Sequence, residues 1–356
     1  MSKTLLILAG GTGGHVFPGL AVADLLRGRG WRVVWMGNPD SFEARTVAAR
    51  AYEMAWVRFA ALRGKGLLRK LLLPLNLLSA FRQAFCEIRR IRPDVVLGMG
   101  GYVSFPGGMM AALLKRPLLI HEQNSIAGLA NRVLARVADR VFCGFPDALP
   151  KGRWVGNPVR PEITGLPEPA ARFARRDATA PRRLLVLGGS LGAAAINETV
   201  PRGLALIPEP ERPAVIHQAG EKHLATLEAN YAAAGVRADC VAFIQDMAGA
   251  YAWADLVLCR SGALTVAELA AAGVAGILVP FPHAVDDHQT ANARFLSSAG
   301  GAVLLPQDEM TPAAVAALIR ECASAQLLRM AERARALARP EAAETLARVC
   351  EEMSGT

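Results

Sequence analysis

The stretch "TLLILAGGTGGHVFPGLAVADLL", residues 4–26, predicts the fold of this chain. Its apolar beginning is typical of a strand buried on both faces, and the glycine cluster after it turns the chain into a helix. The same unit recurs as "DVVLGMGGYVSFPGGMMAALL" (94–114), "RRLLVLGGSLGAAAINETV" (182–200) and "DLVLCRSGALTVAELAAAG" (255–273). Alternation of strands and helices forms parallel sheets covered by helices, so we expect an α/β protein.

The distribution of these units indicates two domains. The chain has 356 residues, which is long for a single hydrophobic core, and two of the units lie in each half. Five prolines fall within residues 154–183, as expected for a crossing between domains. We therefore predict two doubly wound, Rossmann-like domains, 1–160 and 161–339, with a cleft between them that receives the ligand. The helical segment at about 340–356 has no strand after it and can cap either domain, including by packing back on the first.

Charge and cysteine content narrow the class of protein. Residues 1–160 hold 23 Lys/Arg against 9 Asp/Glu, a net charge of +14, whereas the remainder carries −5. The first half is thus expected to meet nucleic acid, a lipid surface or a phosphorylated substrate, unless its cations are only a solvated surface. The six cysteines show no CxxC pair, which disfavours a disulfide framework and a zinc site. The N-terminal apolar run is too short for a secretory signal, and no 18-residue apolar run predicts a membrane span.

The glycine loops do not match the common nucleotide motifs. A GxxxxGK[ST] pattern is absent, and the GxGxxG pattern fails because Val16 stands where its third glycine belongs. No two aspartates are separated by one residue, which disfavours a diphosphate held through a divalent cation. Backbone dipoles and fixed side chains would then have to offset the charge of a leaving group. One such loop is explained by a tight turn alone, but four in a row favour ligand binding.

Several side chains at predicted strand ends suit chemistry or sugar binding. His15 is a candidate general base, because an imidazole can take up a proton near neutral pH, although a purely hydrogen-bonding role is equally compatible. Glu122, in "HEQN" (121–124), is a second candidate base or a structural ion-pair partner. The stretch "FPHAVDDHQTANA" (281–293) favours hydrogen bonds to hydroxyl groups over metal binding. Glu268 can accept both hydroxyls of a ribose, or it is a solvated helical charge.

Residues 62–92 carry a signal of another kind. Cations alternate with leucines at the start of the segment, before an amphipathic helix that begins near Pro74 and ends before Pro93. Phe85 and Ile88 are expected to pack on a sheet. Apolar side chains flanked by cations insert into anionic bilayers, which favours membrane contact over core packing for the start of the segment. The predicted membrane residues are Lys65, Leu67, Leu68, Arg69, Lys70, Leu71, Leu72 and Leu75.

Taken together, these motifs resemble the MurG family of bacterial N-acetylglucosaminyltransferases. The resemblance rests on "GGTGGHVFPGLAVA", "GMGGYVSFPG", "HEQN", "GNPVR", "GGSLGA" and "RSGALTVAEL…PFPHAVDDHQTANA", which follow in the family's order from residue 10 to about 293. It implies a GT-B fold and an inverting transfer of GlcNAc from UDP-GlcNAc to the muramyl C4 hydroxyl of lipid I, which forms lipid II. It also implies no cofactor, no metal in the site, and a role in peptidoglycan synthesis, cell shape and division.

The resemblance assigns roles residue by residue. It makes His15 the candidate base, Glu268 the partner of the ribose, and the loop at 100–104 the contact of the acceptor. The implied donor-binding residues are Thr12, Gly13, Gly14, Asn124, Arg160, Ser190, Ile244, Ala263, Leu264, Thr265, Val266, Ala267, Glu268, Gln289 and Asn292. The implied acceptor-binding residues are Gly100, Gly101, Tyr102 and Ser104. Leu191 departs from the family, in which some members carry Gln, but a backbone role survives that change.

The resemblance also implies partners and a location: UDP-GlcNAc, lipid I, other cell-wall synthesis proteins, and the anionic cytoplasmic face of the inner membrane, bound peripherally. A UDP-sugar epimerase, or a GT-B transferase with another lipid acceptor, is the alternative. A nucleic-acid-binding protein would need aromatic side chains among its cations, and only 6% of the residues are aromatic, so no nucleic-acid partner is expected. An NAD-dependent oxidoreductase is disfavoured by the missing third glycine.

Overall fold

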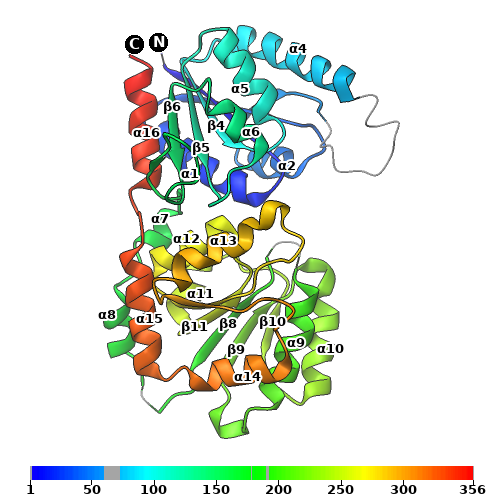
Figure 1. Ribbon diagram of the computed structural model, residues 1–356, viewed down its shortest axis with the longest axis vertical. Coiled ribbons are helices and arrows are strands. Elements are labelled where there is room, and N and C mark those ends of the chain that lie inside the picture. The colour runs from blue at the N-terminus through cyan, green and yellow to red at the C-terminus, as the bar shows by residue number, and fades with distance from the viewer. Residues whose placement is uncertain (1, 60–72, 178, 190–191, 356) are drawn as a thin grey trace. The chain divides into compact units, whose positions relative to one another are not determined.

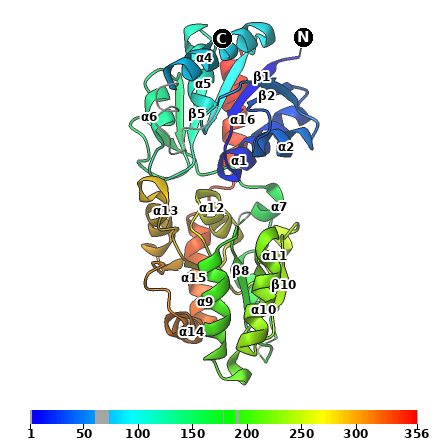
Figure 2. The ribbon, with the colours of Figure 1, turned by 90° about the vertical axis from the view of Figure 1, so that its right-hand side faces the viewer.

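The computed structural model describes residues 2–59, 73–177, 179–189 and 192–355. The chain forms two compact units: unit 1, Met1–Val159 with Pro340–Thr356, and unit 2, Arg160–Arg339. Each unit contains one parallel sheet with helices packed on it (Figures 1 and 2). The predicted α/β class with two doubly wound sheets is therefore confirmed.

Unit 1 has a seven-stranded sheet in the order β3-β2-β1-β4-β5-β6-β7, and every neighbouring pair is parallel. Its strands are β1 (Thr4–Ala9), β2 (Arg32–Gly37), β3 (Glu53–Trp56), β4 (Val95–Gly100), β5 (Leu118–Glu122), β6 (Arg140–Cys143) and β7 (Arg153–Trp154). Its described helices are α1 (Gly13–Gly28), α2 (Phe42–Ala48), α4 (Leu73–Ile91), α5 (Ser104–Leu113), α6 (Leu129–Leu134) and α16 (Ala342–Met353).

The apolar run of β1 explains how this sheet is covered. Successive side chains of a strand point to opposite faces, so Leu5 and Ile7 join the core beneath α1 and α16, while Leu6 and Leu8 join the core beneath α4 and α5. All six residues of β1 are buried. A strand buried on both faces has no need of polar alternation, and for that reason the sequence reads as a continuous apolar run.

The C-terminal helix α16 belongs to unit 1. It packs beside α1 (Figure 1), and its Leu346 and Cys350 lie in the same core as Leu5 and Ile7. On the surface, Arg29 donates to the carboxylates of Glu344 and Glu351, at 2.6 and 2.9 Å. The helical segment predicted at about 340–356 forms α16 and closes one face of the first sheet.

Unit 2 has a six-stranded sheet in the order β10-β9-β8-β11-β12-β13, again parallel throughout. Its strands are β8 (Arg183–Leu187), β9 (Ala214–Gln218), β10 (Asp239–Val241), β11 (Leu256–Cys259), β12 (Ala275–Leu278) and β13 (Ala302–Leu304). Its helices are α7 (Pro161–Thr164), α8 (Pro169–Ala174), α9 (Ala194–Ala205), α10 (Leu224–Ala234), α11 (Met247–Trp253), α12 (Ala263–Ala272), α13 (His288–Ser297), α14 (Pro312–Glu321) and α15 (Ser324–Ala336). Its described residues also form the short 3₁₀ turns η1 (Glu209–Glu211), η2 (Glu221–His223) and η3 (Val285–Asp287).

The strand order places the glycine-rich loops at one position in each sheet. In unit 1 the order reverses between β1 and β4, and in unit 2 it reverses between β8 and β11. Neighbouring crossovers lead to opposite faces at such a point, which opens a crevice outside the carboxyl ends of the strands. All four glycine-rich loops follow these four strands, so each unit presents two of them at its switch point.

Helix α4 begins at Leu73 and ends at Ile91, close to the bounds that Pro74 and Pro93 predict. Ile88 is buried on the sheet, as expected, and Phe85 is half-buried. Across the described part of the chain, no helix is long and apolar enough to cross a membrane.

Candidate active site

The first glycine loop leads from β1 into α1 and brings His15 into the first turn of that helix. Thr12 is the N-cap residue, and the backbone N–H groups of His15 and Val16 donate to its carbonyl oxygen. The loop is held by a buried carboxylate, because the Gly11 N–H donates to Glu43 Oε2 at 3.1 Å. His15 Nδ1 lies 2.7 Å from Gln123 Oε1, so a side chain from the end of β5 fixes the imidazole ring.

The second glycine loop follows β4 and packs directly on the first. Gly101 has a φ of +86°, and a β-carbon there would lie 2.0 Å from the Gly10 carbonyl oxygen, so only glycine fits. A β-carbon on Gly100 would lie 2.9 Å from His15 Cε1 and Nδ1. The second loop therefore forms one wall against the histidine ring.

Tyr102 and Ser104 are hydrogen-bonded within this loop. The Tyr102 hydroxyl donates to Glu43 Oε1 at 2.7 Å, and burial followed by the Glu43 carboxylate raises the pKa of Tyr102. The Ser104 hydroxyl is fully buried, lies 2.7 Å from the carbonyl oxygens of Leu8 and Gly100, and accepts from the Gly100 N–H. Their contact with an acceptor stays a prediction, whereas their role in shaping the loop is visible.

The predicted second base, Glu122, is buried at the end of β5 and is surrounded by donors. Its Oε1 accepts from the backbone N–H and side-chain amide of Asn124, at 2.9 and 3.3 Å. Its Oε2 accepts from the Gly128 N–H and from Asn131 Nδ2, at 3.2 and 2.9 Å. Four N–H donors stabilise the carboxylate and hold the loop at 122–131, so the geometry favours a structural role for Glu122.

In unit 2, the loop after β11 opens into α12 without a side-chain cap. Gly262 is the N-cap residue, no acidic residue occupies the first turn, and Ala263, Leu264 and Thr265 form that turn. The backbone N–H groups at a helix start and the helix dipole favour a bound anion. Beside them, the Ser261 hydroxyl is fully buried and has no hydrogen-bond partner among the described residues. A buried hydroxyl without a protein partner can hydrogen-bond a ligand oxygen at the helix start.

Glu268 lies in the second turn of α12, buried between two donors. The Tyr251 hydroxyl donates to Glu268 Oε2 at 3.0 Å, and the Arg160 guanidinium donates to Oε1 at 3.1 Å. Burial raises the pKa of Glu268, and the positive charge of Arg160 opposes that shift. Burial also raises the pKa of Tyr251, which therefore stays protonated and donates. Arg160 and Glu268, assigned to the same ligand by the resemblance, are thus in contact.

The remaining predicted donor residues of unit 2 lie near α13 and β10. Asn292 is buried on α13 and its Nδ2 donates to the Ser261 carbonyl oxygen at 3.2 Å, which links it to the start of α12. Gln289, also on α13, accepts from the Phe281 N–H at 2.9 Å. Ile244 is half-buried after β10. Ser190 and the departure at Leu191 lie outside the described residues, as do the predicted membrane residues Lys65, Leu67, Leu68, Arg69, Lys70, Leu71 and Leu72.

Sequence reasoning missed the residues that hold these loops. Glu43 joins the first and second glycine loops, Gln123 and His121 support His15, and Gln218 bonds both the N–H and the carbonyl of Gly189 in the third loop. Gln123 and His121 stand inside the quoted "HEQN", so their position at a strand end was available as a signal. Glu43 is far from any glycine loop in sequence, so no sequence signal pointed to its role.

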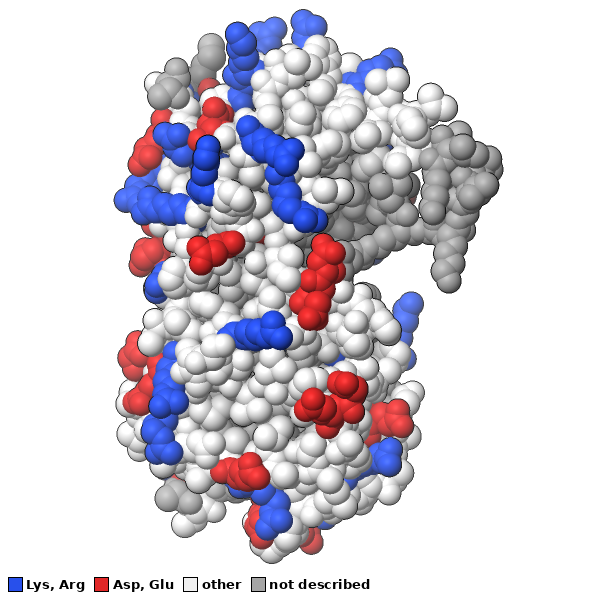
Figure 3. Space-filling model, viewed as in Figure 1, with Lys and Arg blue, Asp and Glu red and all other residues white. Residues whose placement is uncertain are grey.

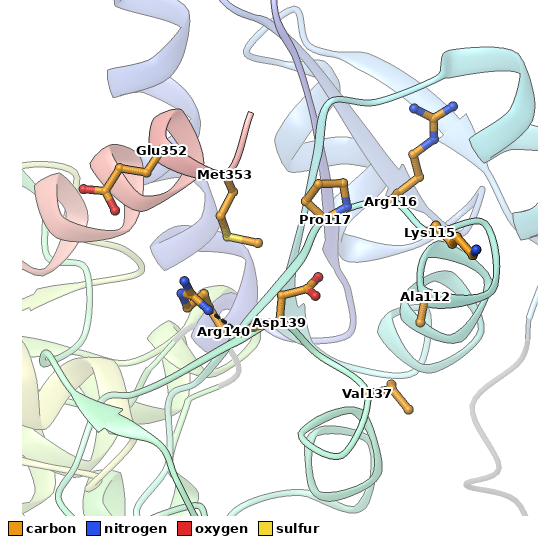
Figure 4. A pocket seen from close by; sticks show the side chains of 9 residues that line it. All are labelled: Ala112, Lys115, Arg116, Pro117, Val137, Asp139, Arg140, Glu352 and Met353. Atoms are coloured by element: carbon orange, nitrogen blue, oxygen red, sulfur yellow. Dashed lines mark hydrogen bonds between the residues drawn. The ribbon is translucent and has the colours of Figure 1, made fainter. Parts of the chain in front are cut away.

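A pocket of about 560 Å³ lies elsewhere in unit 1 (Figure 4). It is formed where the chain enters β5 and β6, next to the end of α16, and its charged lining includes Lys115, Arg140 and Glu352. This is the amino-terminal edge of the sheet, so the pocket contains none of the predicted site residues. Within the described residues, no group of three or more His, Cys, Asp and Glu side chains could hold a metal ion.

Parallel sheets with glycine-rich loops at both switch points are typical of nucleotide-binding folds, and two family profiles identify the class as glycosyltransferases. The glycosyltransferase family 28 N-terminal domain matches residues 5–143, and the family 28 C-terminal domain matches residues 183–348. The fold is GT-B.

Full-length relatives narrow the class further. A protein of Dechloromonas aromatica named "UDP-N-acetylglucosamine--N-acetylmuramyl-(pentapeptide) pyrophosphoryl-undecaprenol N-acetylglucosamine transferase" is 65% identical over 99% of this chain and 100% of its own length. The protein of the same name from Azoarcus sp. is 66% identical over 99% of this chain and 98% of its length. The crystal structure of Acinetobacter baumannii MurG matches with a TM-score of 0.86 and 39% identity, over 98% and 99% of the two chains. This chain belongs to the MurG family of glycosyltransferases.

Proposed function

We propose that this protein transfers GlcNAc from UDP-GlcNAc to the C4 hydroxyl of the muramyl sugar of lipid I, with inversion, and so forms lipid II for peptidoglycan. The observation that carries the proposal is its identity of 65% over the whole length of a relative named for this transfer. The loops described above support it, because they supply an anion-binding helix start in unit 2 and a positioned histidine in unit 1.

Unit 2 is assigned the donor. The uncapped start of α12, together with the Ser261 hydroxyl, receives diphosphate oxygens, and Arg160 adds a positive charge. Glu268 accepts from the ribose hydroxyls, because each of its oxygens has a second lone pair beside the bonds to Tyr251 and Arg160. Gln289 and Asn292 read sugar hydroxyls, Ile244 offers its backbone to uracil, and Ser190 completes the diphosphate site.

Unit 1 is assigned the base. His15 is partly exposed and sits between the two glycine loops, whereas the Glu122 carboxylate already accepts four N–H bonds. His15 therefore takes the proton of the acceptor hydroxyl, and the hydroxyl oxygen attacks the anomeric carbon of GlcNAc. The bond between that carbon and the phosphate oxygen breaks, and UDP leaves with the electron pair. Thr12, Gly13, Gly14 and Asn124 face the donor sugar, and the loop at 100–104 faces the acceptor.

The membrane assignment rests on α4 and its neighbourhood. Leu75 and Leu78 are 64% and 66% exposed on this helix, and Leu113, at the end of the adjacent α5, is 65% exposed. Lys and Arg side chains are spread over unit 1 on the face shown in Figure 3. Exposed leucines in a unit with a strongly basic sequence support binding to the anionic cytoplasmic surface of the inner membrane, with each cation near the surface contributing about 1 kcal/mol.

Two assays test the proposal. Radiolabelled UDP-GlcNAc is incubated with a lipid-linked muramyl acceptor, with and without EDTA, and we expect label in the lipid product under both conditions. Label transferred only to another lipid acceptor, or epimerisation of the donor sugar without transfer, would replace the proposal with one of the alternatives.

In flotation with anionic vesicles, the double variant Leu75→Ser/Leu78→Ser should bind less than the native protein, while Leu206→Ser, which changes an exposed leucine of unit 2, serves as the control.

A further inference from the structure

A chain of three side chains leads from a buried carbonyl group to His15. His121 is fully buried at the end of β5, and its Nε2 lies 2.9 Å from the Gly156 carbonyl oxygen. A carbonyl oxygen only accepts, so Nε2 carries the hydrogen. Burial lowers the pKa of His121 to about 4, which keeps the ring neutral at pH 7. A neutral imidazole has one N–H, and His121 Nδ1 is therefore an acceptor.

Gln123 connects His121 to His15, and the acceptor at His121 Nδ1 fixes the orientation of its side-chain amide. Its Nε2 lies 3.0 Å from His121 Nδ1 and 3.0 Å from the His121 carbonyl oxygen, and both of these atoms accept hydrogen bonds. The amide group that faces them must be the donor, so the orientation of the Gln123 side chain follows from the network. Gln123 is 1% exposed, and its Oε1 is left facing His15.

The last link fixes the proton of His15. Gln123 Oε1 only accepts, so His15 Nδ1, 2.7 Å away, carries the hydrogen. The Nδ1 and Cε1 edge of the ring is covered by Gly100, where a β-carbon would come within 2.9 Å of both atoms. In its neutral form His15 then presents Nε2 as its lone-pair acceptor, and the described residues give that atom no hydrogen-bond partner.

We infer that Gln123 and His121 are positioning residues that hold the proton of His15 on Nδ1 and thereby reserve Nε2 for the acceptor hydroxyl. The inference rests on the proposed function, in which His15 is the base. The acceptor proton passes to Nε2 as the oxygen–carbon bond forms and UDP departs, and the resulting imidazolium releases that proton to water after the products leave. An amide serves this purpose without placing a negative charge beside the ring, unlike the carboxylate that orients histidine in hydrolytic triads.

The first test is spectroscopic and needs no activity. The full-length protein is labelled with ¹⁵N-histidine, and ¹H–¹⁵N correlation spectra at pH 7.5 report the tautomer of each ring, with His15→Ala used to assign the His15 signals. We expect the Nδ1–H tautomer for His15 and the Nε2–H tautomer for His121. An Nε2–H tautomer at His15 in the native protein would overturn the inference.

The second test is the variant Gln123→Met, which keeps the length of the side chain and removes both hydrogen-bonding groups. We expect kcat to fall at least about tenfold, with KM for UDP-GlcNAc changed less than about threefold. In its spectrum His15 loses the fixed Nδ1–H tautomer, while His121, still bonded to Gly156, keeps its own and serves as the internal control. Gln326→Met on α15 is the matched substitution, for which no change is expected. A kcat for Gln123→Met within about twofold of native would contradict the inference.

Failure of the proposed function gives a different pattern. If His15→Ala retains native turnover, His15 is not the base, yet the spectra still decide whether the chain fixes its tautomer. If His15→Ala is inactive and the spectra show the wrong tautomer, the base survives and the positioning role is lost.

Discussion

Both units bury glutamates near the carboxyl ends of their strands, but the donors around these carboxylates differ. In unit 1, Glu43 and Glu122 accept from backbone N–H groups of the loops: Gly11 and Asn38 for the former, Asn124 and Gly128 for the latter. In unit 2, Glu268 accepts from the side chains of Tyr251 and Arg160 alone among the bonds described. A carboxylate bonded to backbone holds a loop in place, whereas one bonded to side chains can still receive a ligand.

The two units also show that the net charge of a domain does not tell where an anion binds. The first half of the chain carries +14, yet its loops are anchored by buried carboxylates. The second half carries −5, yet it contains the start of α12, which like those of α1 and α5 has no capping side chain, and beside it the buried Ser261 hydroxyl has no partner among the described residues. Local donors decide where a diphosphate binds, and the summed charge of a domain reports on its outer surface instead.

The largest effect is expected at the proton acceptor of unit 1. His15→Ala should lower kcat by about 100- to 10,000-fold, the range of general base catalysis, because no other side chain in the loop offers a free basic nitrogen. KM for UDP-GlcNAc should change little, since the nucleotide of the donor is assigned to unit 2. Steady-state kinetics measures both constants, and equal losses in the two would make His15 a binding residue.

The second largest effect is expected at Glu268 of unit 2 and concerns the affinity for the donor. Glu268→Gln keeps the shape of the side chain but removes the charge that accepts ribose hydroxyls, so KM for UDP-GlcNAc should rise about 10- to 100-fold. Isothermal titration with UDP, which needs no acceptor, checks the same loss. A variant with native UDP affinity would remove Glu268 from the donor site.

The corresponding change in unit 1 should act on stability. Glu122→Gln turns an amide NH₂ toward two of the four N–H donors, and we expect the free energy of unfolding to fall by about 2 kcal/mol. Thermal or urea unfolding measures it, with Glu268→Gln unfolded in parallel. If Glu268→Gln is the more destabilising variant and Glu122→Gln the weaker binder of UDP, the contrast between the two units is wrong.

The smallest effect concerns a feature that the units share, because each buries one neutral histidine. Burial lowers the pKa of His121 to about 4 and that of His217 to about 3, while the unfolded chain binds a proton near pH 6.5. The unfolded state then binds more protons as the pH falls, so stability is lost below about pH 6.5. Between pH 7.5 and 5.5 each histidine should cost about 1 kcal/mol.

The variant His217→Gln isolates this contribution. Glu268, whose pKa burial raises, changes stability with pH in the opposite direction, so the two proteins must be compared at each pH. The difference in unfolding free energy between native protein and variant should shrink as the pH falls. A difference independent of pH would show that His217 does not resist protonation in the folded state.

Much of this arrangement was predictable because it depends on local pattern. Apolar runs followed by glycine identify β1, β4, β8 and β11. Because a loop that follows a parallel strand lies at the carboxyl end of the sheet, the sequence also places His15 and Ser261 at that end of their sheets. The residues that anchor the loops were not predictable in the same way. Glu43 reaches Gly11 and Tyr102 from a different helix, and a glutamate in a short amphipathic segment carries no sign of its distant partners.

The same limit explains Glu122. Sequence places it at a strand end, where a carboxylate can be a base or a structural acceptor, and only the positions of the Asn124, Gly128 and Asn131 donors distinguish the two. Gln123 offers no comparable signal in the sequence, because glutamine neither titrates nor carries charge. Its importance follows from a hydrogen-bond direction that is set by the buried ring of His121.

Helix α16 affects the order of events during synthesis. Its Leu346, Ala347 and Cys350 complete a core begun by β1, so the first sheet lacks one cover until these residues have been synthesised. At about 5–20 residues per second, some 200 further residues delay this closure by roughly 10–40 s. Throughout that interval the part of this core that α16 covers stays exposed to solvent.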